Sequence, residues 1–235
     1  FKSLQRLIWR KILNIKNKDI AVIHVSPLPY SGNRRLGYGA PTETQVFNIE
    51  KNFIEIYNQI NKNIYFKKYP ANRFPYKFKY KEIFPEYKKV KFIGDIDYRY
   101  LRSAFDIIVT GNPTSTFSWC LSANKPLIFF DSKKISPLIN NTIRKKIEKS
   151  VFYINLDLLS WQESLKNILN MPYNDLIKIW QEKSLERKKF IEEHIFCNTK
   201  HPGTKVANFV NSLIIKMRQL FVGKLIDFLI IEVTN

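Results

Sequence analysis

Cysteine is scarce in this chain of 235 residues, which holds only Cys120 and Cys197, too few for a disulfide framework. The N-terminal segment lacks the charged start, apolar stretch and small-residue cleavage site of a secretory signal peptide. We therefore expect a cytoplasmic protein. The sequence begins at Phe1 rather than at a methionine, and we expect it to belong to a longer protein. Apolar runs are only a few residues long, far short of the roughly 20 that a transmembrane helix needs.

Acidic residues are also in short supply, with 20 Asp and Glu against 39 Lys and Arg and a net charge of +19. Such a balance is typical of proteins that bind nucleic acid, acidic lipid or phosphorylated substrates. Abundant Lys, Ile, Asn, Phe and Tyr are equally what an A/T-rich coding sequence produces, so both explanations stay open. Apolar residues make up 45% of the chain and aromatics 14%, which excludes a mainly disordered protein.

Short apolar runs alternate with segments of helical periodicity along most of the chain. Strands are expected over 19–27, 63–70, 90–94, 106–111 and 126–131, and helices over 42–62, 98–105, 117–125, 161–170 and 173–194. Either Thr42 or Thr44 is available to cap the first of these helices. This alternation predicts an α/β protein with a Rossmann-like, doubly wound parallel sheet over residues 19–213.

The N-terminal flank, residues 1–18, places apolar residues near helical spacing among six basic residues and no acid. This pattern predicts a cationic amphipathic helix. Such a helix suits the surface of an anionic membrane or packing against a neighbouring N-terminal domain outside this sequence, and we favour the second.

The C-terminal flank, residues 214–235, is an amphipathic tail that charged residues interrupt too often for a transmembrane helix. One helical face collects seven apolar residues, namely Leu213, Met217, Leu220, Phe221, Leu225, Phe228 and Leu229. An apolar face of this size is seldom left exposed to water. It would be covered either by docking of the tail within the protein or by a membrane surface.

A loop of small, hydroxyl-bearing residues, 112–116, follows the expected strand 106–111. Ligands of doubly wound sheets sit beyond the carboxyl ends of the strands, where helix N-termini present free N–H groups. We therefore expect Thr114, Ser115 and Thr116 to hydrogen-bond a diphosphate, with Asn112 in the same site. The alternative is that Thr114 or Ser115 only caps the next helix.

The loop after the first expected strand offers a second group of phosphate ligands. Arg34 and Arg35 stand among Gly32, Gly37 and Gly39, and glycines let a backbone approach a ligand while arginines bind phosphate. The loop fits neither the dinucleotide pattern G-x-G-x-x-G nor the Walker A pattern. A solvated loop is the alternative.

Two groups of residues have the spacing of metal ligands. Asp95 and Asp97 form a D-x-D pair that suits a divalent cation, but Asp97 also precedes a helix that it can cap. His194, Cys197 and His201 have zinc-like spacing without a fourth ligand, and we interpret them as a surface turn. We expect no metal and no cofactor.

Two potentially reactive side chains stand within apolar segments. His24 lies in the first expected strand, where we expect a hydrogen-bonded core histidine. Cys120 lies in the expected helix 117–125, where we expect a buried thiol and no nucleophile.

Residues 62–91 carry ten basic and two acidic residues, and over 71–91 Lys and Arg alternate with Phe and Tyr. Basic and aromatic residues in this mixture also line surfaces for single-stranded nucleic acid. No recognisable nucleic-acid module accompanies them. A nucleic-acid partner is therefore not favoured.

The run GDIDYRYLRSAFDIIVTGNPTSTFSWCLSANKPLIFFD (94–131) resembles the nucleotide-binding C-terminal domain of GT-B transferases that build bacterial surface polysaccharides. These include the glycerol-phosphate transferases of teichoic acid synthesis. The segment IYFKKYP (64–70) matches a family strand that ends in Lys-x-His-Pro, with Tyr69 in place of the His. Residues 180–195 look like a late helix of the family, and the similarity extends over residues 19–213.

This resemblance implies a GT-B donor-binding half that works with a second, N-terminal domain. Ser115 and Thr116 would bind the phosphates of the donor, with help from Arg34, Arg35 and Lys68. The implied reaction moves a glycosyl or polyol-phosphate group from a nucleotide-sugar or CDP-polyol donor to a polysaccharide or lipid-linked acceptor. The acceptor-side base would lie outside this sequence. By the same resemblance we favour docking of the tail 214–235 within the protein, whereas the basic amphipathic ends also suit a location on the inner face of the plasma membrane.

Two other functions remain open. A GT-B-like sugar-nucleotide epimerase or hydrolase shares the expected fold but acts on the sugar nucleotide alone. A non-catalytic basic module would bind a membrane surface or nucleic acid through residues 62–91. Nucleotide binding distinguishes the enzymes from the module.

Overall fold

The structure is a computed structural model and describes residues 2–26, 42–67, 87, 89–94, 96–111, 115–133, 139–195 and 211–212. The chain divides into two compact units, residues 1–190 and 191–235. The elements are α1 (Lys2–Ile12), β1 (Ala21–Val25), α2 (Glu43–Gln59), β2 (Asn63–Lys67), β3 (Val90–Ile93), α4 (Tyr98–Leu101), β4 (Ile107–Gly111), α5 (Ser115–Leu121), β5 (Leu127–Asp131), α6 (Asn141–Ser150), β6 (Phe152–Asn155), α7 (Trp161–Asn170), α8 (Tyr173–Glu182) and α9 (Ser184–His194).

Six parallel strands form one sheet in the order β3-β2-β1-β4-β5-β6. This is the strand order of the Rossmann fold, in which the sheet is built outward in both directions from its centre. The central strands β1, β4 and β5 are buried along their whole length, as continuous apolar runs in parallel sheets generally are. The predicted Rossmann-like α/β fold is confirmed.

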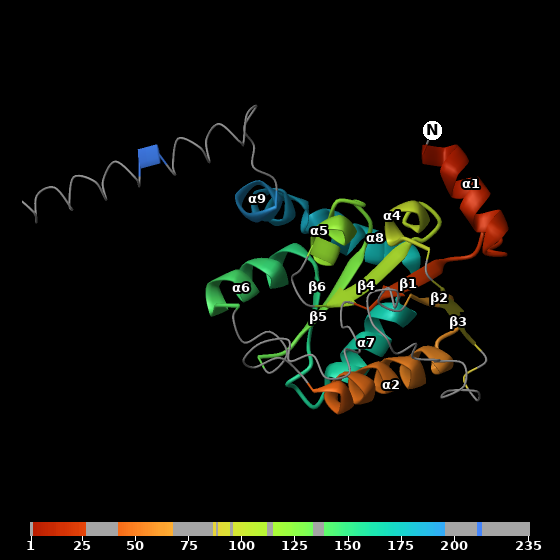
Figure 1. Ribbon diagram of the computed structural model, residues 1–235, viewed down its shortest axis with the longest axis horizontal. Coiled ribbons are helices and arrows are strands. Elements are labelled where there is room, and N and C mark those ends of the chain that lie inside the picture. The colour runs from red at the N-terminus through yellow and green to blue at the C-terminus, as the bar shows by residue number, and fades with distance from the viewer. Residues whose placement is uncertain are drawn as a thin grey trace, which may run out of the picture. The chain divides into compact units, whose positions relative to one another are not determined.

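Helices cover both faces of the sheet (Figure 1): α2 and α7 lie on one face, and α4 and α5 on the other. On the α2 face, Phe53 packs against Phe130 of β5 and Trp161 of α7, with ring centroids 4.6 and 5.2 Å apart. On the opposite face, Phe117 of α5 lies 4.5 Å from Phe129 of β5. Aromatic side chains from helices and strands therefore form much of the core on each side.

The start of α2 is fixed by a capping box, in which Thr42 accepts a hydrogen bond from the Gln45 backbone and Gln45 accepts one from the Thr42 backbone. Such reciprocal bonds satisfy N–H groups that have no partner within the helix. Of the two predicted candidates, Thr42 and Thr44, it is Thr42 that caps α2.

His24 is fully buried in the core between α2 and the sheet. Its ring stacks on Phe66 at 4.5 Å, and its Nδ1 lies 2.7 Å from the Tyr57 hydroxyl. No described residue hydrogen-bonds its Nε2. Burial lowers the pKa of His24 from 6.5 to about 3, so the imidazole is neutral at physiological pH. The predicted core histidine is confirmed, with one nitrogen hydrogen-bonded.

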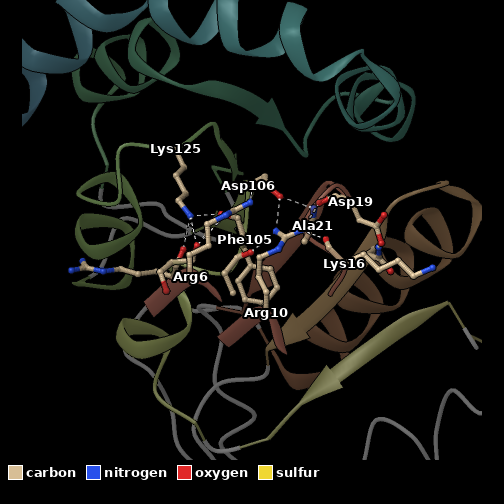
Figure 2. Close-up of polar contacts among 12 residues, drawn as sticks. Arg6, Arg10, Lys16, Asp19, Ala21, Phe105, Asp106 and Lys125 are labelled. Atoms are coloured by element: carbon tan, nitrogen blue, oxygen red, sulfur yellow. Dashed lines mark hydrogen bonds and ion pairs between the residues drawn. The ribbon is translucent and has the colours of Figure 1, made fainter. Parts of the chain in front are cut away.

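Helix α1 is attached to the amino-terminal end of the sheet by its arginines. Arg10 is 1% exposed, and its guanidinium donates to the carbonyls of Ala104 and Asp19 and to Asp106 Oδ2. Arg6 binds the other oxygen of Asp106 at 2.7 Å. Figure 2 shows these side chains converging on Asp106, just ahead of β4. The sequence predicted the helix, and the structure shows that two of its cations point inward.

The long helix expected over 173–194 is wrong, because the chain breaks at Lys183 into α8 and α9. The Trp180 carbonyl, in the last turn of α8, accepts a hydrogen bond at 2.9 Å from Arg187 of α9. The Arg187 guanidinium also lies 3.5 Å from the centre of the Trp180 ring. A single residue thus ties the two helices together across the break.

Helix α6 was not expected from the sequence, because only Ile143 and Ile147 supply apolar side chains between its polar residues. Asn140 caps it by accepting a hydrogen bond at 2.8 Å from the Ile143 backbone. This cap, the burial of Ile147 and the ion pair of Arg144 with Asp131 hold the helix in place.

No helix in the described part of the chain is both long and apolar enough to span a bilayer. The tail 214–235 and most of 71–91 lie outside the described residues, so the predictions made for them stay predictions.

Candidate functional site

The strand order reverses direction between β1 and β4, which pair in parallel with Val25 opposite Thr110. The chain therefore leaves both strands at the same edge of the sheet, after Val25 and after Gly111. The Thr110 hydroxyl donates to the Val25 carbonyl at 2.9 Å, joining the two strand ends. In open α/β sheets the crevice at such a reversal is where ligands bind.

Ser115 and Thr116 form the first turn of α5, next to the end of β4. The expectation that α5 begins at 117 is wrong by two residues. Phe117 and Cys120 anchor the helix, because both side chains are buried in the core. Ser115 is exposed and Thr116 is partly exposed. Both stand in the first turn of α5, where the backbone N–H groups have no intrahelical partners.

The other expected phosphate ligands, Arg34, Arg35, Lys68, Asn112 and Thr114, lie outside the described residues. The loops that carry four of them leave the sheet at the ends of β1 and β4. The assignment of these five residues to the site stays a prediction.

Gly111 ends β4 beneath the Phe130 ring. A Cβ atom at this position would lie 2.2 Å from Phe130 Cε2, and Phe130 is itself enclosed in the core. A glycine is needed here because the ring occupies the space of a side chain. The close approach fixes the backbone from which the 112–114 loop departs.

Glu50 and Ser26 form a buried polar pair at the end of β1. Both are 2% exposed, and the Ser26 hydroxyl donates to Glu50 Oε1. Sequence reasoning missed Glu50, although a signal was present: it is a carboxylate among the buried positions of α2, four residues after Val46. A buried acid beside a ligand crevice is a feature of functional sites as well as of structural networks.

Lys67 is a second buried charge; it was not among the expected site residues, although it is the Lys of the Lys-x-His-Pro pattern. It ends β2, is 2% exposed, and its Nζ donates to the Gly94 carbonyl at 3.3 Å. Lys67 also contributes to the lowered pKa of Asp97. The carboxyl edge of the sheet therefore holds a cation in addition to those predicted.

Asp97 is the N-cap of α4. Of the two alternatives, metal ligand and helix cap, the structure shows the cap. Its Oδ1 accepts from the Arg99 backbone at 2.8 Å, and its carboxylate pairs with the Arg99 side chain. Hydrogen bonding to Arg99 is the main cause that lowers the Asp97 pKa. Asp95 lies outside the described residues, and among those described no group of three His, Cys, Asp or Glu could hold a metal ion.

Cys120 is fully buried, and burial raises the pKa of its thiol to about 12. A thiol with so high a pKa carries almost no thiolate at neutral pH. The expectation of a buried thiol in the core is confirmed.

A pocket of about 430 Å³ lies beside the edge strand β6, between α6 and α7. Its charged lining consists of Lys133, Arg144, Lys145 and Glu148. Buried Asp131, at the end of β5, accepts hydrogen bonds from Arg144 at 2.8 Å and from Tyr153 at 3.2 Å. Burial raises the pKa of Tyr153, which therefore stays protonated and donates to Asp131.

No protein-family model and no curated protein matches this sequence. Among solved structures, a variant of the wall teichoic acid polymerase TagF is 13% identical over 93% of this chain and 49% of its own, with a TM-score of 0.50. WaaG, a glycosyltransferase involved in lipopolysaccharide biosynthesis, is 14% identical over 79% of this chain and 46% of its own, with a TM-score of 0.49. MurG of Acinetobacter baumannii is 10% identical over 80% of this chain and 48% of its own, with a TM-score of 0.42.

The chain thus has the Rossmann-like fold of one half of a GT-B structure, shared with TagF. It spans about half the length of the structures it matches. The resemblance drawn from residues 94–131 is confirmed at the level of fold.

Proposed function

We propose that this chain is the donor-binding half of a transferase that moves a glycosyl or polyol-phosphate group from a nucleotide-activated donor to an envelope polysaccharide or lipid-linked acceptor. The observation that carries the proposal is the reversal of strand order at β1 and β4, with the hydroxyls of Ser115 and Thr116 beside it. The GT-B fold shared with a wall teichoic acid polymerase supports it.

In this proposal the donor diphosphate lies against the first turn of α5. The Ser115 and Thr116 hydroxyls and the free N–H groups of this turn donate hydrogen bonds to it. Arg34, Arg35, Lys68, Asn112 and Thr114 contribute from the adjoining loops, and Lys67 adds positive charge at the same edge. These groups stabilise the charge that develops on the departing diphosphate.

The acceptor side of the reaction is assigned to a second domain. In GT-B enzymes the acceptor lies across a cleft from the donor half, and this chain spans about half the length of the structures it matches. We assign the general base to no residue of this chain and propose a location of the enzyme at the inner face of the plasma membrane.

The Ser115→Ala/Thr116→Ala double variant tests the site. We expect it to weaken the binding of nucleoside diphosphate by about 1–3 kcal/mol, or roughly 5- to 150-fold, because two hydrogen bonds to a charged group are lost. Isothermal titration calorimetry measures the change. Ser122→Ala is the matched control, because Ser122 lies one residue past the far end of the same helix and donates to the Trp119 carbonyl. Equal affinity in the folded double variant would remove α5 from the site.

A further inference from the structure

Helix α1 carries its apolar side chains outward. Leu4, Leu7, Ile8 and Ile12 are 58%, 51%, 48% and 61% exposed. Spacings of three and four residues place them along one side of the helix, and we call these four residues the α1 apolar face. A contiguous apolar surface of this kind usually marks a site of interaction.

The arginines of α1 fix the direction in which this face points. Arg10 is enclosed between α1 and the sheet, and Arg6 and Arg10 bind opposite oxygens of Asp106. Rotating the helix to bury its leucines would expose Asp106 and break both ion pairs, which is costly for buried charges. The outward position of the α1 apolar face is therefore a stable feature of the fold.

The charges around the α1 apolar face are positive. Residues 1–18 contain six basic residues and no acid, and exposed Lys11, Lys16 and Lys18 lie on or just after the helix. Two acids near the helix are engaged: Asp106 by the arginines, and Asp19 by the Asn63 amide at 3.0 Å. Apolar residues bordered by cations suit a surface that is apolar beneath an anionic layer.

The position of α1 separates this face from the proposed donor site. Asp106 and Ala21, which anchor the helix, stand at the amino-terminal ends of β4 and β1, whereas Ser115 follows the carboxyl end of β4. Figure 2 shows the anchor at the start of the strands. A partner bound to α1 therefore leaves the carboxyl edge of the sheet accessible.

We propose that the α1 apolar face binds the surface of an anionic lipid bilayer, with its four apolar side chains at the boundary of headgroups and acyl chains. Lys11, Lys16 and Lys18 lie against the acidic headgroups. The helix rests in the plane of the interface, as amphipathic helices with cationic borders do. The proposal takes the membrane surface, the alternative to packing of this helix on a neighbouring domain, and it stands independently of the proposed transferase activity.

Co-sedimentation with lipid vesicles tests this proposal on the full chain. We expect binding to vesicles of mixed phosphatidylglycerol and phosphatidylcholine, much weaker binding to phosphatidylcholine alone, and release at high salt as the lysine contacts are screened. The Leu4→Gln/Ile8→Gln variant should lose about tenfold or more in vesicle affinity, because two apolar side chains no longer enter the interface. Gln is a good helix former, so α1 is kept.

The matched control is Leu159→Gln/Leu185→Gln, which removes two exposed leucines at positions outside α1. It should bind vesicles as the unaltered chain does, and all three proteins should unfold at similar urea concentrations. No vesicle binding by the unaltered chain would overturn the proposal. So would unchanged binding by the α1 variant, which would assign the membrane contact to another segment such as the tail 214–235. Self-association that the α1 variant abolishes while vesicle binding persists would assign the face to a second copy.

Discussion

Replacing Arg10 with alanine is expected to lower the free energy of unfolding by about 3–5 kcal/mol, the cost typical of removing one partner from a buried ion pair. The Arg10 guanidinium joins the segment after α1 to the starts of β1 and β4 through the Asp19 and Ala104 carbonyls and Asp106. Without it, Asp106 keeps only Arg6 and the Ala21 backbone as partners in this cluster. Urea unfolding followed by circular dichroism measures the loss.

Lys11→Ala is the control for this variant, because Lys11 is the adjacent residue and is exposed. We expect it to change stability by less than about 0.5 kcal/mol. Arg10→Lys should fall between the two, since an ammonium cannot reach all the acceptors that the planar guanidinium joins. A loss below about 1 kcal/mol in Arg10→Ala would show that the ion pair neither holds α1 nor fixes the direction of its apolar face.

The free energy of unfolding is expected to fall at acidic pH because of His24. Burial lowers its pKa from 6.5 to about 3, so between these values the unfolded chain binds a proton that the folded chain does not. Stability therefore falls as the pH decreases from 6.5 towards 3, by about 1.4 kcal/mol per unit. Between pH 7 and pH 5 the contribution of His24 is about 2 kcal/mol.

The His24→Phe variant should lose this component, because phenylalanine fills the ring stack on Phe66 without titrating. The free energy of unfolding is measured at both pH values, and the difference between the two proteins isolates the histidine. Tyr57→Phe serves as the control, because it removes the hydrogen bond to Nδ1 but keeps the buried imidazole. An equal pH dependence in the unaltered chain and His24→Phe would show that His24 does not titrate as its burial requires.

The sheet was predictable from the sequence because each central strand is encoded by a local run of apolar residues. Continuous apolar runs identified β1, β4 and β5, and helical periodicity with Thr42 as a cap identified α2. Helix α6 and the break between α8 and α9 were not predictable in this way. The first contains only two apolar residues, Ile143 and Ile147, and the second depends on a contact of Arg187 with Trp180.

The candidate site was predictable in its position but not in its composition. Turn-forming, hydroxyl-bearing residues after an apolar run pointed to Ser115 and Thr116, which do begin a helix at the end of β4. Glu50 and Lys67 were missed because their burial depends on elements distant in the sequence. The direction of α1 was missed for the same reason, since Asp106 lies 96 residues from Arg10 along the chain.

A donor-binding domain must bind a nucleotide, and a thermal-shift panel of UDP, CDP, GDP and their monophosphates on the full chain measures this binding. A ligand at about 100 times its Kd adds about 2.7 kcal/mol to stability. We predict that at least one diphosphate raises Tm by several degrees, more than its monophosphate does, and that Ser115→Ala/Thr116→Ala reduces the shift while Ser122→Ala does not. A chain whose Tm responds to none of these nucleotides would contradict the assignment of a donor-binding domain.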